Sequence, residues 1–206
     1  MTRPLWTIGD LLAESEGRLF ADGRSANTPI TGIKIDSREC GVGDLFVALS
    51  GGQRDGHEFL QSAALAGAAA ALVKRPDRNA DIAQIIVDDG LAGLTRLANA
   101  GRRRFIGKMI GITGSVGKTG SKDLLAHALS GLGRTHANKR SFNNHIGVPI
   151  SLATLPADYD FAVQEIGMNR SGEIATLTAI TRPDVVMITR VAGTHSAFFK
   201  SIDAIA

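Results

Sequence analysis

The feature that most constrains the fold of this chain is a glycine loop, Gly111–Thr119, which reads Gly-Ile-Thr-Gly-Ser-Val-Gly-Lys-Thr. A short apolar strand is predicted at Met109–Thr113, and apolar residues at helical spacing follow the loop. A glycine loop between a strand and a helix surrounds phosphate oxygens with backbone N–H groups. The segment therefore predicts an ATP-binding phosphate loop in a parallel-sheet domain.

The residues expected to bind the nucleotide are Gly114, Ser115, Val116, Gly117, Lys118 and Thr119. The glycines let the backbone approach the phosphates, Lys118 supplies charge to the β- and γ-phosphates, and the Thr119 hydroxyl can hold Mg²⁺. The loop departs from the strict Walker spacing, because Ile112 stands where that pattern has glycine. The alternative is a glycine-rich turn with an incidental lysine, which the flanking strand and helix disfavour.

Strands and helices are expected to alternate along the chain. The pattern predicts strands at 33–36, 45–49, 70–73, 84–87, 109–113, 161–166 and 185–189, and helices at 58–67, 91–104 and 172–180. This favours an α/β fold, with a small mixed α/β N-terminal domain over residues 1–107 and a P-loop parallel-sheet ATPase domain over residues 108–206. The second domain is expected to be incomplete, because the sequence ends where a new helix begins near Ser201.

Composition argues against several classes of protein. The 206 residues carry 23 Lys and Arg against 20 Asp and Glu, and the two signs are interspersed, so no nucleic-acid partner is expected. The densest basic run, Arg102–Arg104, is interpreted as solvated surface at the end of a helix. The single cysteine, Cys40, favours a reducing compartment and hence the cytoplasm. The longest apolar run, Ala63–Val73, is too short to insert into a membrane.

Further segments resemble those of the Mur ligases, the ATP-dependent amide-bond ligases of peptidoglycan precursor synthesis. The resemblance to their N-terminal UDP-sugar-binding domain rests on 36–38, 43–49 and 55–59, and that to their central ATPase domain on 143–149, 165–169, 172–173 and 181–183. The wording of 143–149, Asn-Asn-His-Ile-Gly-Val-Pro, is most similar to the branch that adds D-Ala-D-Ala to UDP-N-acetylmuramoyl-tripeptide. The branch that adds a diamino acid is the alternative within the family.

The resemblance implies roles for residues beyond the phosphate loop. Glu165 ends a predicted strand at the sheet edge where α/β enzymes bind ligands, and its carboxylate is expected to hold Mg²⁺ and act in catalysis. His195 resembles the family histidine near a second metal and the acyl phosphate. Relatives usually have Asn where this chain has Arg190 and Glu where it has Ala197, so this second metal site is expected to be altered.

Amide and basic side chains complete the expected site. Asn143 is expected to bind the nucleotide and Asn144 to act in catalysis, because amide donors suit a site crowded with anions. Ser37, Arg38 and His57 are expected, by resemblance, to contact the uridine diphosphate. For the asparagines, plain turn chemistry is the alternative.

The implied reaction phosphorylates the tripeptide carboxylate with ATP, and the amine of D-Ala-D-Ala then attacks the acyl phosphate. Family members continue well beyond the length of this chain, so we expect the 206 residues to bind nucleotide without completing turnover. Two alternatives of other classes remain. One is a non-catalytic module that binds nucleotide or UDP-precursor, and the other is a different P-loop enzyme such as a small kinase or GTPase. Oligomeric state is not predicted.

Overall fold

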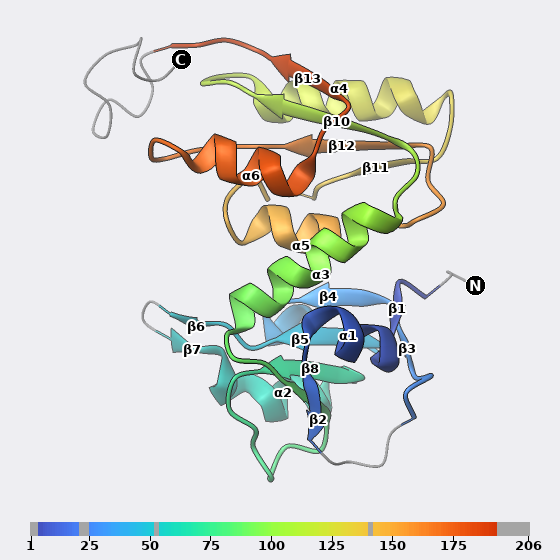
Figure 1. Cartoon of the computed structure of the whole chain (residues 1–206), viewed down its shortest axis with the longest axis vertical. Coiled ribbons are helices and arrows are strands. Elements are labelled where there is room, and N and C mark those ends of the chain that lie inside the picture. Colours follow the sequence, from blue (N-terminus) through green and yellow to red (C-terminus); the bar gives the residue numbers. More distant parts are fainter. Residues whose placement is uncertain (1–3, 21–24, 52–53, 140–141, 193–206) are drawn as a thin grey trace. The chain divides into compact units, whose positions relative to one another are not determined.

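The computed structural model describes residues 4–20, 25–51, 54–139 and 142–192 (Figure 1). The chain divides into two compact units, Met1–Leu97 and Ala98–Ala206. The division falls inside helix α3 (Gly90–Arg104). The domain boundary expected between residues 107 and 108 stays a prediction.

The first unit is built around a five-stranded sheet in the order β2-β9-β8-β5-β4. Its strands are β2 (Arg18–Phe20), β4 (Gly32–Lys34), β5 (Asp44–Val47), β8 (Ala70–Val73) and β9 (Ala83–Ile86), and of these five only β2 runs antiparallel to its neighbour. Two small antiparallel pairs join β1 (Trp6–Thr7) to β3 (Pro29–Ile30) and β6 (Ser50–Gly51) to β7 (Arg54–Asp55). The helices are α1 (Ile8–Ser15), α2 (Leu60–Leu65) and the first part of α3, with the 3-10 turns η1 (Ser37–Glu39) and η2 (Gly56–Phe59).

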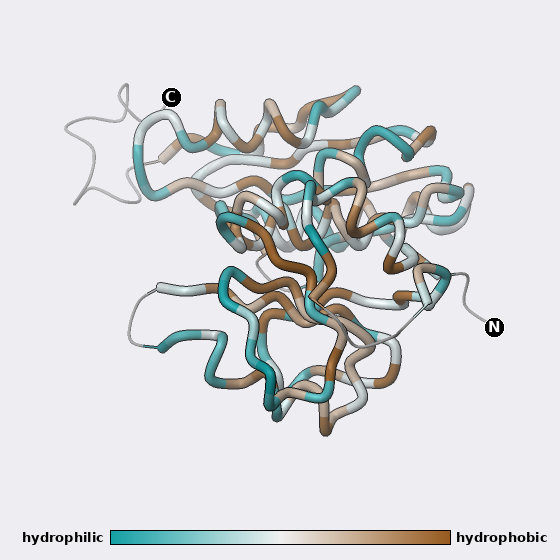
Figure 2. Tube along the Cα trace, turned by 60° about the horizontal axis from the view of Figure 1, so that its bottom comes forward, coloured by the Kyte–Doolittle hydropathy of each residue, from teal (hydrophilic) through white to brown (hydrophobic). Residues whose placement is uncertain are grey.

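Burial and local capping explain these elements. All four residues of β5 and all four of β8 are buried, as expected of central parallel strands that are covered on both faces. Figure 2 shows hydrophobic stretches, in brown, interspersed with hydrophilic ones, in teal, along the chain. Helix α1 begins with a capping box, in which the Asp10 backbone N–H donates to Thr7 Oγ1 at 3.1 Å and the Thr7 N–H donates to Asp10 Oδ2 at 2.8 Å.

The second unit contains a parallel four-stranded sheet in the order β11-β12-β10-β13. Its strands are β10 (Lys108–Thr113), β11 (Thr135–Ala137), β12 (Phe161–Glu165) and β13 (Val185–Ile188), and its helices are α4 (Lys118–Ser130), α5 (Gly147–Ala153) and α6 (Glu173–Thr181). Because all four strands are parallel, their carboxyl ends meet at one edge of the sheet. The glycine loop leaves β10 at this edge.

Helices cover both faces of the second sheet. On one face, Ile110 and Ile112 pack with Leu125 and Leu129 of α4. On the other, Met109 packs in a cluster that also takes side chains from α5 and α6. This alternation follows the two-residue period of a strand. Strand β13 at the edge differs, since all four of its side chains are exposed.

The α/β prediction is confirmed, and each predicted strand overlaps an observed one to within about two residues. The sequence analysis did not anticipate α1, α5 or β11. Its interpretation of Arg102 as solvated surface is wrong: the side chain is 13% exposed and its guanidinium donates to the carbonyls of Thr181 and Arg182, each at 2.8 Å. Within the described part of the chain, no helix has the length and hydropathy needed to cross a membrane.

Candidate functional site

The glycine loop lies where β10 passes into α4, as predicted. Gly114 has φ of +136°, and a Cβ built on it would lie 2.3 Å from Thr189 Oγ1, so only glycine fits this position. Gly117 has φ of +87° and stands at the N-cap of α4, where no side chain caps the helix. The backbone N–H groups and the dipole at this helix start therefore favour a bound anion.

The loop is held by bonds to the lysine and to the segment after β13. Lys118 Nζ donates to the Gly114 carbonyl at 2.6 Å, across the loop. The Ser115 backbone N–H donates to the Arg190 carbonyl at 2.6 Å, and the Ser115 hydroxyl donates to the Ala192 carbonyl at 3.0 Å. Val116 is 54% exposed at the tip. The conformation of the loop is therefore fixed by bonds within the protein.

Three of the predicted site residues meet at the end of β12. Glu165 is 1% exposed, and its carboxylate accepts one hydrogen bond from Thr119 Oγ1 at 2.9 Å and another from Asn143 Nδ2 at 2.7 Å. Thr119 lies in the first turn of α4, and Asn143 lies between β11 and α5. The fold thus brings residues far apart in the sequence to the same sheet edge as the glycine loop.

The donor atoms at this edge fit Mg²⁺. A hydroxyl oxygen and a carboxylate are hard ligands, and Mg²⁺ in nucleotide sites is usually bound by one or two carboxylates together with phosphate oxygens and water. No group of three or more His, Cys, Asp or Glu that could hold a metal occurs among the described residues. Thr119 and Glu165 supply two such oxygen ligands, which suits a cation that also binds phosphate oxygens of a nucleotide. His195, expected at a second metal site, lies outside the described residues.

Asn144 has a local structural task. Its Oδ1 accepts hydrogen bonds from the backbone N–H groups of Ile146 at 3.1 Å and Gly147 at 2.9 Å, which directs the chain into α5. This is the turn chemistry that the sequence left open as the alternative. The catalytic role expected for Asn144 stays a prediction.

A cavity of about 730 Å³ opens in the first unit. This volume is within the range of small-molecule sites, roughly 300–1,000 Å³. Two of the predicted contacts, Ser37 and Arg38, line it, together with Ile35, Asp36, Leu49, Arg54, Gly56, Phe59, Ser62 and Ala66. Arg38 donates to the Asp36 carboxylate at 2.5 to 3.2 Å, and this hydrogen bonding holds the pKa of Asp36 at about 2.

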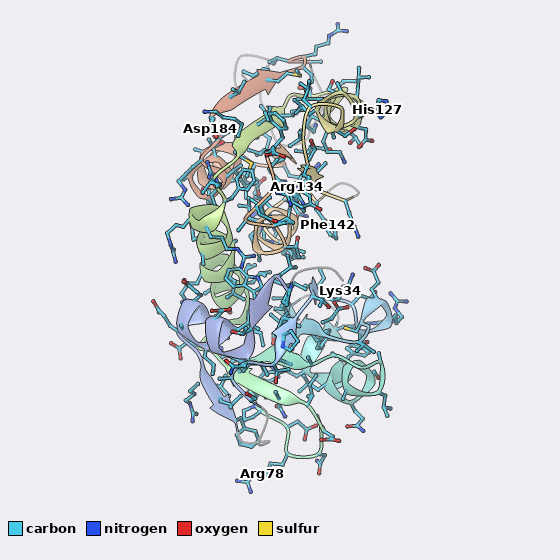
Figure 3. The ribbon with its side chains drawn as sticks, turned by 90° about the vertical axis from the view of Figure 1, so that its right-hand side faces the viewer. Lys34, Arg78, His127, Arg134, Phe142 and Asp184 are labelled. Carbon is cyan, nitrogen blue, oxygen red and sulfur yellow. The ribbon has the colours of Figure 1, made fainter. Side chains whose placement is uncertain are left out.

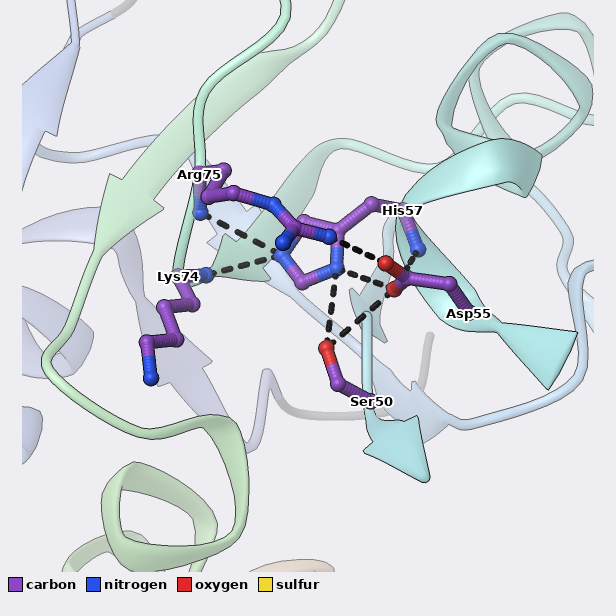
Figure 4. Close-up of polar contacts among 5 residues, drawn as sticks. All are labelled: Ser50, Asp55, His57, Lys74 and Arg75. Carbon is purple, nitrogen blue, oxygen red and sulfur yellow. Dashed lines mark hydrogen bonds and ion pairs between the residues drawn. The ribbon is translucent and has the colours of Figure 1, made fainter. Parts of the chain in front are cut away.

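His57 is bonded within the protein on both sides of its ring (Figure 4). Its Nδ1 lies 2.6 Å from Asp55 Oδ1, and its Nε2 accepts the backbone N–H groups of Lys74 at 2.9 Å and Arg75 at 3.3 Å. Since Nε2 accepts, the proton lies on Nδ1 and is donated to Asp55. The hydrogen bonds from His57 lower the pKa of Asp55 well below its usual range, and Arg75 also pairs with Asp55. His57 is not among the residues that line the cavity, and its predicted contact with the ligand stays a prediction.

Sequence reasoning missed two residues at these sites. Arg54 lines the cavity and could have been suspected only from its place beside the 55–59 motif. Asn138 is 2% exposed and accepts the Glu165 backbone N–H at 2.8 Å. Its only sequence signal is that it follows a strand of three residues, which was itself not predicted.

Comparison with known proteins gives one consistent result. The profile described as "Mur ligase family, catalytic domain" matches residues 29–102, and that described as "Mur ligase middle domain" matches residues 112–206. Two curated proteins named UDP-N-acetylmuramoyl-tripeptide--D-alanyl-D-alanine ligase are similar along most of this chain. The Synechocystis sp. protein is 41% identical over 88% of the chain, and the Escherichia coli protein is 37% identical over 97%.

Solved structures agree with the sequence matches. MurF from Acinetobacter baumannii is 35% identical with a TM-score of 0.87, and the match covers 98% of this chain and 44% of that one. MurF from Thermotoga maritima, solved in complex with ADP, is 32% identical with a TM-score of 0.72, covering 84% of this chain and 40% of that one. The chain spans 40% of the length of the Synechocystis protein and 44% of the E. coli protein. Over that length, sequence and fold both match, and the chain belongs to the Mur ligase family.

Proposed function

We propose that this chain provides the precursor-binding and ATP-binding parts of a cytoplasmic ligase that adds D-Ala-D-Ala to UDP-N-acetylmuramoyl-tripeptide. The observation that carries this proposal is the meeting of Gly114–Thr119 with Glu165 and Asn143 at one sheet edge, in a chain whose relatives are ligases of this name. The complex of the Thermotoga relative with ADP supports adenine nucleotide as the ligand of the loop.

The proposed chemistry has two steps. The terminal carboxylate of the tripeptide attacks the γ-phosphorus of ATP, which forms an acyl phosphate and releases ADP. The amine of D-Ala-D-Ala then attacks the acyl carbon, so that an amide forms, phosphate leaves and the amine loses a proton. No protein nucleophile is needed, so the protein contributes position and charge.

The described residues would divide this work among them. Lys118 would exchange the Gly114 carbonyl for the β- and γ-phosphates and neutralise their charge, while the α4 N–H groups donate to phosphate oxygens. Thr119 and Glu165 would hold Mg²⁺, which when bound neutralises phosphate charge. Asn143 would orient the Glu165 carboxylate through its 2.7 Å hydrogen bond. These roles are proposals from geometry.

The first unit would hold the UDP end of the precursor in the cavity lined by Ser37, Arg38 and Arg54. Arginine suits a diphosphate because its planar fork offers paired N–H donors. Arg38 is already paired with Asp36, so a phosphate would share or replace that carboxylate.

The experiment that tests the ATP-binding part is isothermal titration of the 206-residue chain with Mg-ATP, beside Lys118→Ala. Saturable binding that weakens at least about tenfold in the variant is expected, since charge-assisted contacts to phosphate contribute more than about 1.4 kcal/mol. Equal binding by the two chains would remove Lys118 from the site. No binding by a folded wild-type chain would reject the ATP-binding proposal.

The alternative is a module that binds nucleotide or UDP-precursor without chemistry. Phosphate release, measured with ATP, UDP-tripeptide and D-Ala-D-Ala, distinguishes a ligase from a non-catalytic binding module. We expect ATP binding without release of phosphate from the 206 residues alone.

A further inference from the structure

Asn138 is a buried amide that neither the sequence motifs nor the proposed chemistry uses. It follows β11 directly, at the same sheet edge as Glu165, and is 2% exposed. Its Oδ1 accepts the Glu165 backbone N–H at 2.8 Å, its Nδ2 donates to the Phe142 carbonyl at 3.3 Å, and its own carbonyl accepts Lys122 Nζ at 2.9 Å. One side chain and one carbonyl thus join β11 to three other segments.

Through Lys122, Asn138 is tied to the helix that carries the phosphate loop. Lys122 is 3% exposed, although lysine is almost never fully buried without a partner. It lies three residues after Thr119 on α4, and residues at that spacing share a helix face. Thr119 therefore bonds the carboxylate of Glu165 while Lys122 bonds the residue that holds the backbone of Glu165. The distance from α4 to the end of β12 is fixed at two points.

Through Phe142, Asn138 also positions the loop that contributes Asn143. The Phe142 carbonyl accepts from Asn138 Nδ2 and from Gln164 Nε2 at 3.1 Å, and Figure 3 labels Phe142 in the second unit. The next residue, Asn143, donates to Glu165 Oε1, and its carbonyl accepts the Gly167 N–H at 2.8 Å. The loop is therefore bound to both ends of the Glu165 segment.

We propose that Asn138 is a positioning residue for the Mg²⁺-dependent part of ATP binding, because it fixes the backbone of Glu165 and the loop of Asn143 relative to Thr119. The inference rests on the proposed ATP function and on Glu165 as a cation ligand. Groups that orient a metal ligand usually change metal affinity by about 10- to 100-fold when they are removed. By contrast, Lys118 bonds the Gly114 carbonyl within the phosphate loop, a contact in which Asn138 takes no part.

The test compares the Kd for ATP in EDTA with the Kd in Mg²⁺, by isothermal titration of the 206-residue chain. The ratio of the Kd in EDTA to the Kd in Mg²⁺ measures how much Mg²⁺ strengthens ATP binding. Asn138→Ala is expected to lower this ratio about tenfold or more, while its Kd in EDTA stays within about twofold of the wild-type value. The matched control is Thr181→Val, which also removes a hydrogen bond from a fully buried side chain of the second unit, the 2.8 Å bond from Thr181 Oγ1 to the Leu177 carbonyl. Its ratio is expected to equal that of the wild type.

A measurement without metal or nucleotide supports the same test. In amide hydrogen exchange, the Glu165 N–H is expected to lose protection in Asn138→Ala and to keep it in Thr181→Val. If Asn138→Ala does not fold, Lys122→Met removes the donor to the Asn138 carbonyl and keeps the buried stem. It is expected to lower the Kd ratio in the same direction by a smaller factor.

The outcomes separate the inference from the function on which it rests. An unchanged ratio in Asn138→Ala, or an equal weakening with and without Mg²⁺, overturns the positioning role while ATP binding stands. A wild-type chain that binds ATP equally well in EDTA and Mg²⁺ overturns it as well. A folded wild-type chain that binds no ATP in either condition overturns the proposed function, and the inference with it.

Discussion

Two polar clusters, a buried one around Glu165 and a partly exposed one around His57, differ in the kind of partner they use. Glu165 is bonded through its carboxylate to two side chains, Thr119 and Asn143. The His57 ring is bonded on one side to Asp55 and on the other to two backbone N–H groups. Side chains can rotate to admit a ligand, whereas the His57 ring, which accepts two backbone N–H groups on one side and pairs with Asp55 on the other, is held in one orientation. We therefore expect Glu165 to be the more available of the two to a ligand, and His57 to contribute more to the stability of the first unit.

The largest predicted loss of stability, and the strongest test of this comparison, concerns His57. We expect His57→Ala to destabilise the first unit by about 3 kcal/mol, because it removes a side chain that is only 9% exposed and takes the acceptor from two backbone N–H groups. Urea unfolding followed by the fluorescence of Trp6, the one tryptophan of the chain, measures this in the first unit. A fully stable variant with weakened UDP binding would instead make His57 a ligand contact.

His136 on β11 gives the next largest effect, since its ring is less completely bonded than that of His57. Burial, aided by the positive charge of Lys139, lowers its pKa to about 4, and Nε2 has no hydrogen-bond partner. The folded state therefore keeps His136 neutral, whereas the unfolded chain protonates it below its ordinary pKa of about 6.5. The free energy of unfolding is unaffected by this group above pH 6.5 and falls as the pH drops from there toward 4. The loss is about 3 kcal/mol at most.

Hydrogen exchange of β12 amides at pH 7.5 and pH 5 measures this dependence in the second unit. His136→Gln does not titrate in this range, so its stability should fall less between the two values than that of the wild type. Parallel losses in the two chains would show that other groups, such as the carboxylates, cause the pH dependence.

Glu165→Gln tests the other side of the comparison. We expect the affinity for Mg-ATP to fall about 10- to 100-fold while the free energy of unfolding changes by less than about 1 kcal/mol, because glutamine can still accept from Thr119 or Asn143 but lacks the charge that Mg²⁺ prefers. Titration with Mg-ATP and denaturant unfolding check the two halves. A large loss of stability with intact Mg-ATP binding would place Glu165 in the same structural class as His57.

Alanine substitutions at the two positive-φ glycines of the phosphate loop, Gly114 and Gly117, are expected to change stability by smaller amounts. Gly117→Ala meets no atom within 4 Å and is strained only by its φ of +87°, so a cost of about 1 kcal/mol is expected. Gly114→Ala carries in addition the 2.3 Å approach to Thr189 Oγ1 and should be the more harmful of the two. Thermal unfolding of both variants checks the order, and equal melting temperatures would mean that the loop relaxes freely around Gly114.

The smallest effect on stability is expected at β13. Val186 is 55% exposed on an edge strand whose four side chains are all apolar and exposed, and such edges invite pairing with another chain. Val186→Lys should lower self-association in sedimentation experiments and change stability by less than about 0.5 kcal/mol. Unchanged association would mean that the edge of β13 does not pair with another copy.

How much could be predicted from the sequence depended on whether a signal was local. The glycine loop, β10 and α4 were predicted because spacing within a dozen residues specifies them. Helix α5 was missed because all seven of its residues are buried, so it has no amphipathic period, and it contains Pro149. Arg102 was misjudged because its acceptors, the carbonyls of Thr181 and Arg182, lie about 80 residues away in the sequence.

The candidate site was predictable to the same degree. Thr119 was expected at the site because it belongs to the glycine-loop motif, and Glu165 because it ends a predicted strand. In the structure, Thr119 Oγ1 lies 2.9 Å from Glu165 Oε2. Asn138 could not be predicted, because its bond to Glu165 depends on β11 pairing with β12. The three residues of β11 contain no sequence pattern that predicts this pairing. The internal bonding of His57 was hidden for the same reason, since its backbone partners follow β8.

The bond from Lys118 to the Gly114 carbonyl has a consequence for how nucleotide binding is measured. Lysine carries three N–H donors, so the ammonium can keep the Gly114 carbonyl as one acceptor while a phosphate oxygen becomes another. The heat of binding should therefore report a phosphate contact added to a lysine that the loop itself orients. The carbonyl thereby reduces the conformational entropy that the long lysine side chain loses when it contacts phosphate.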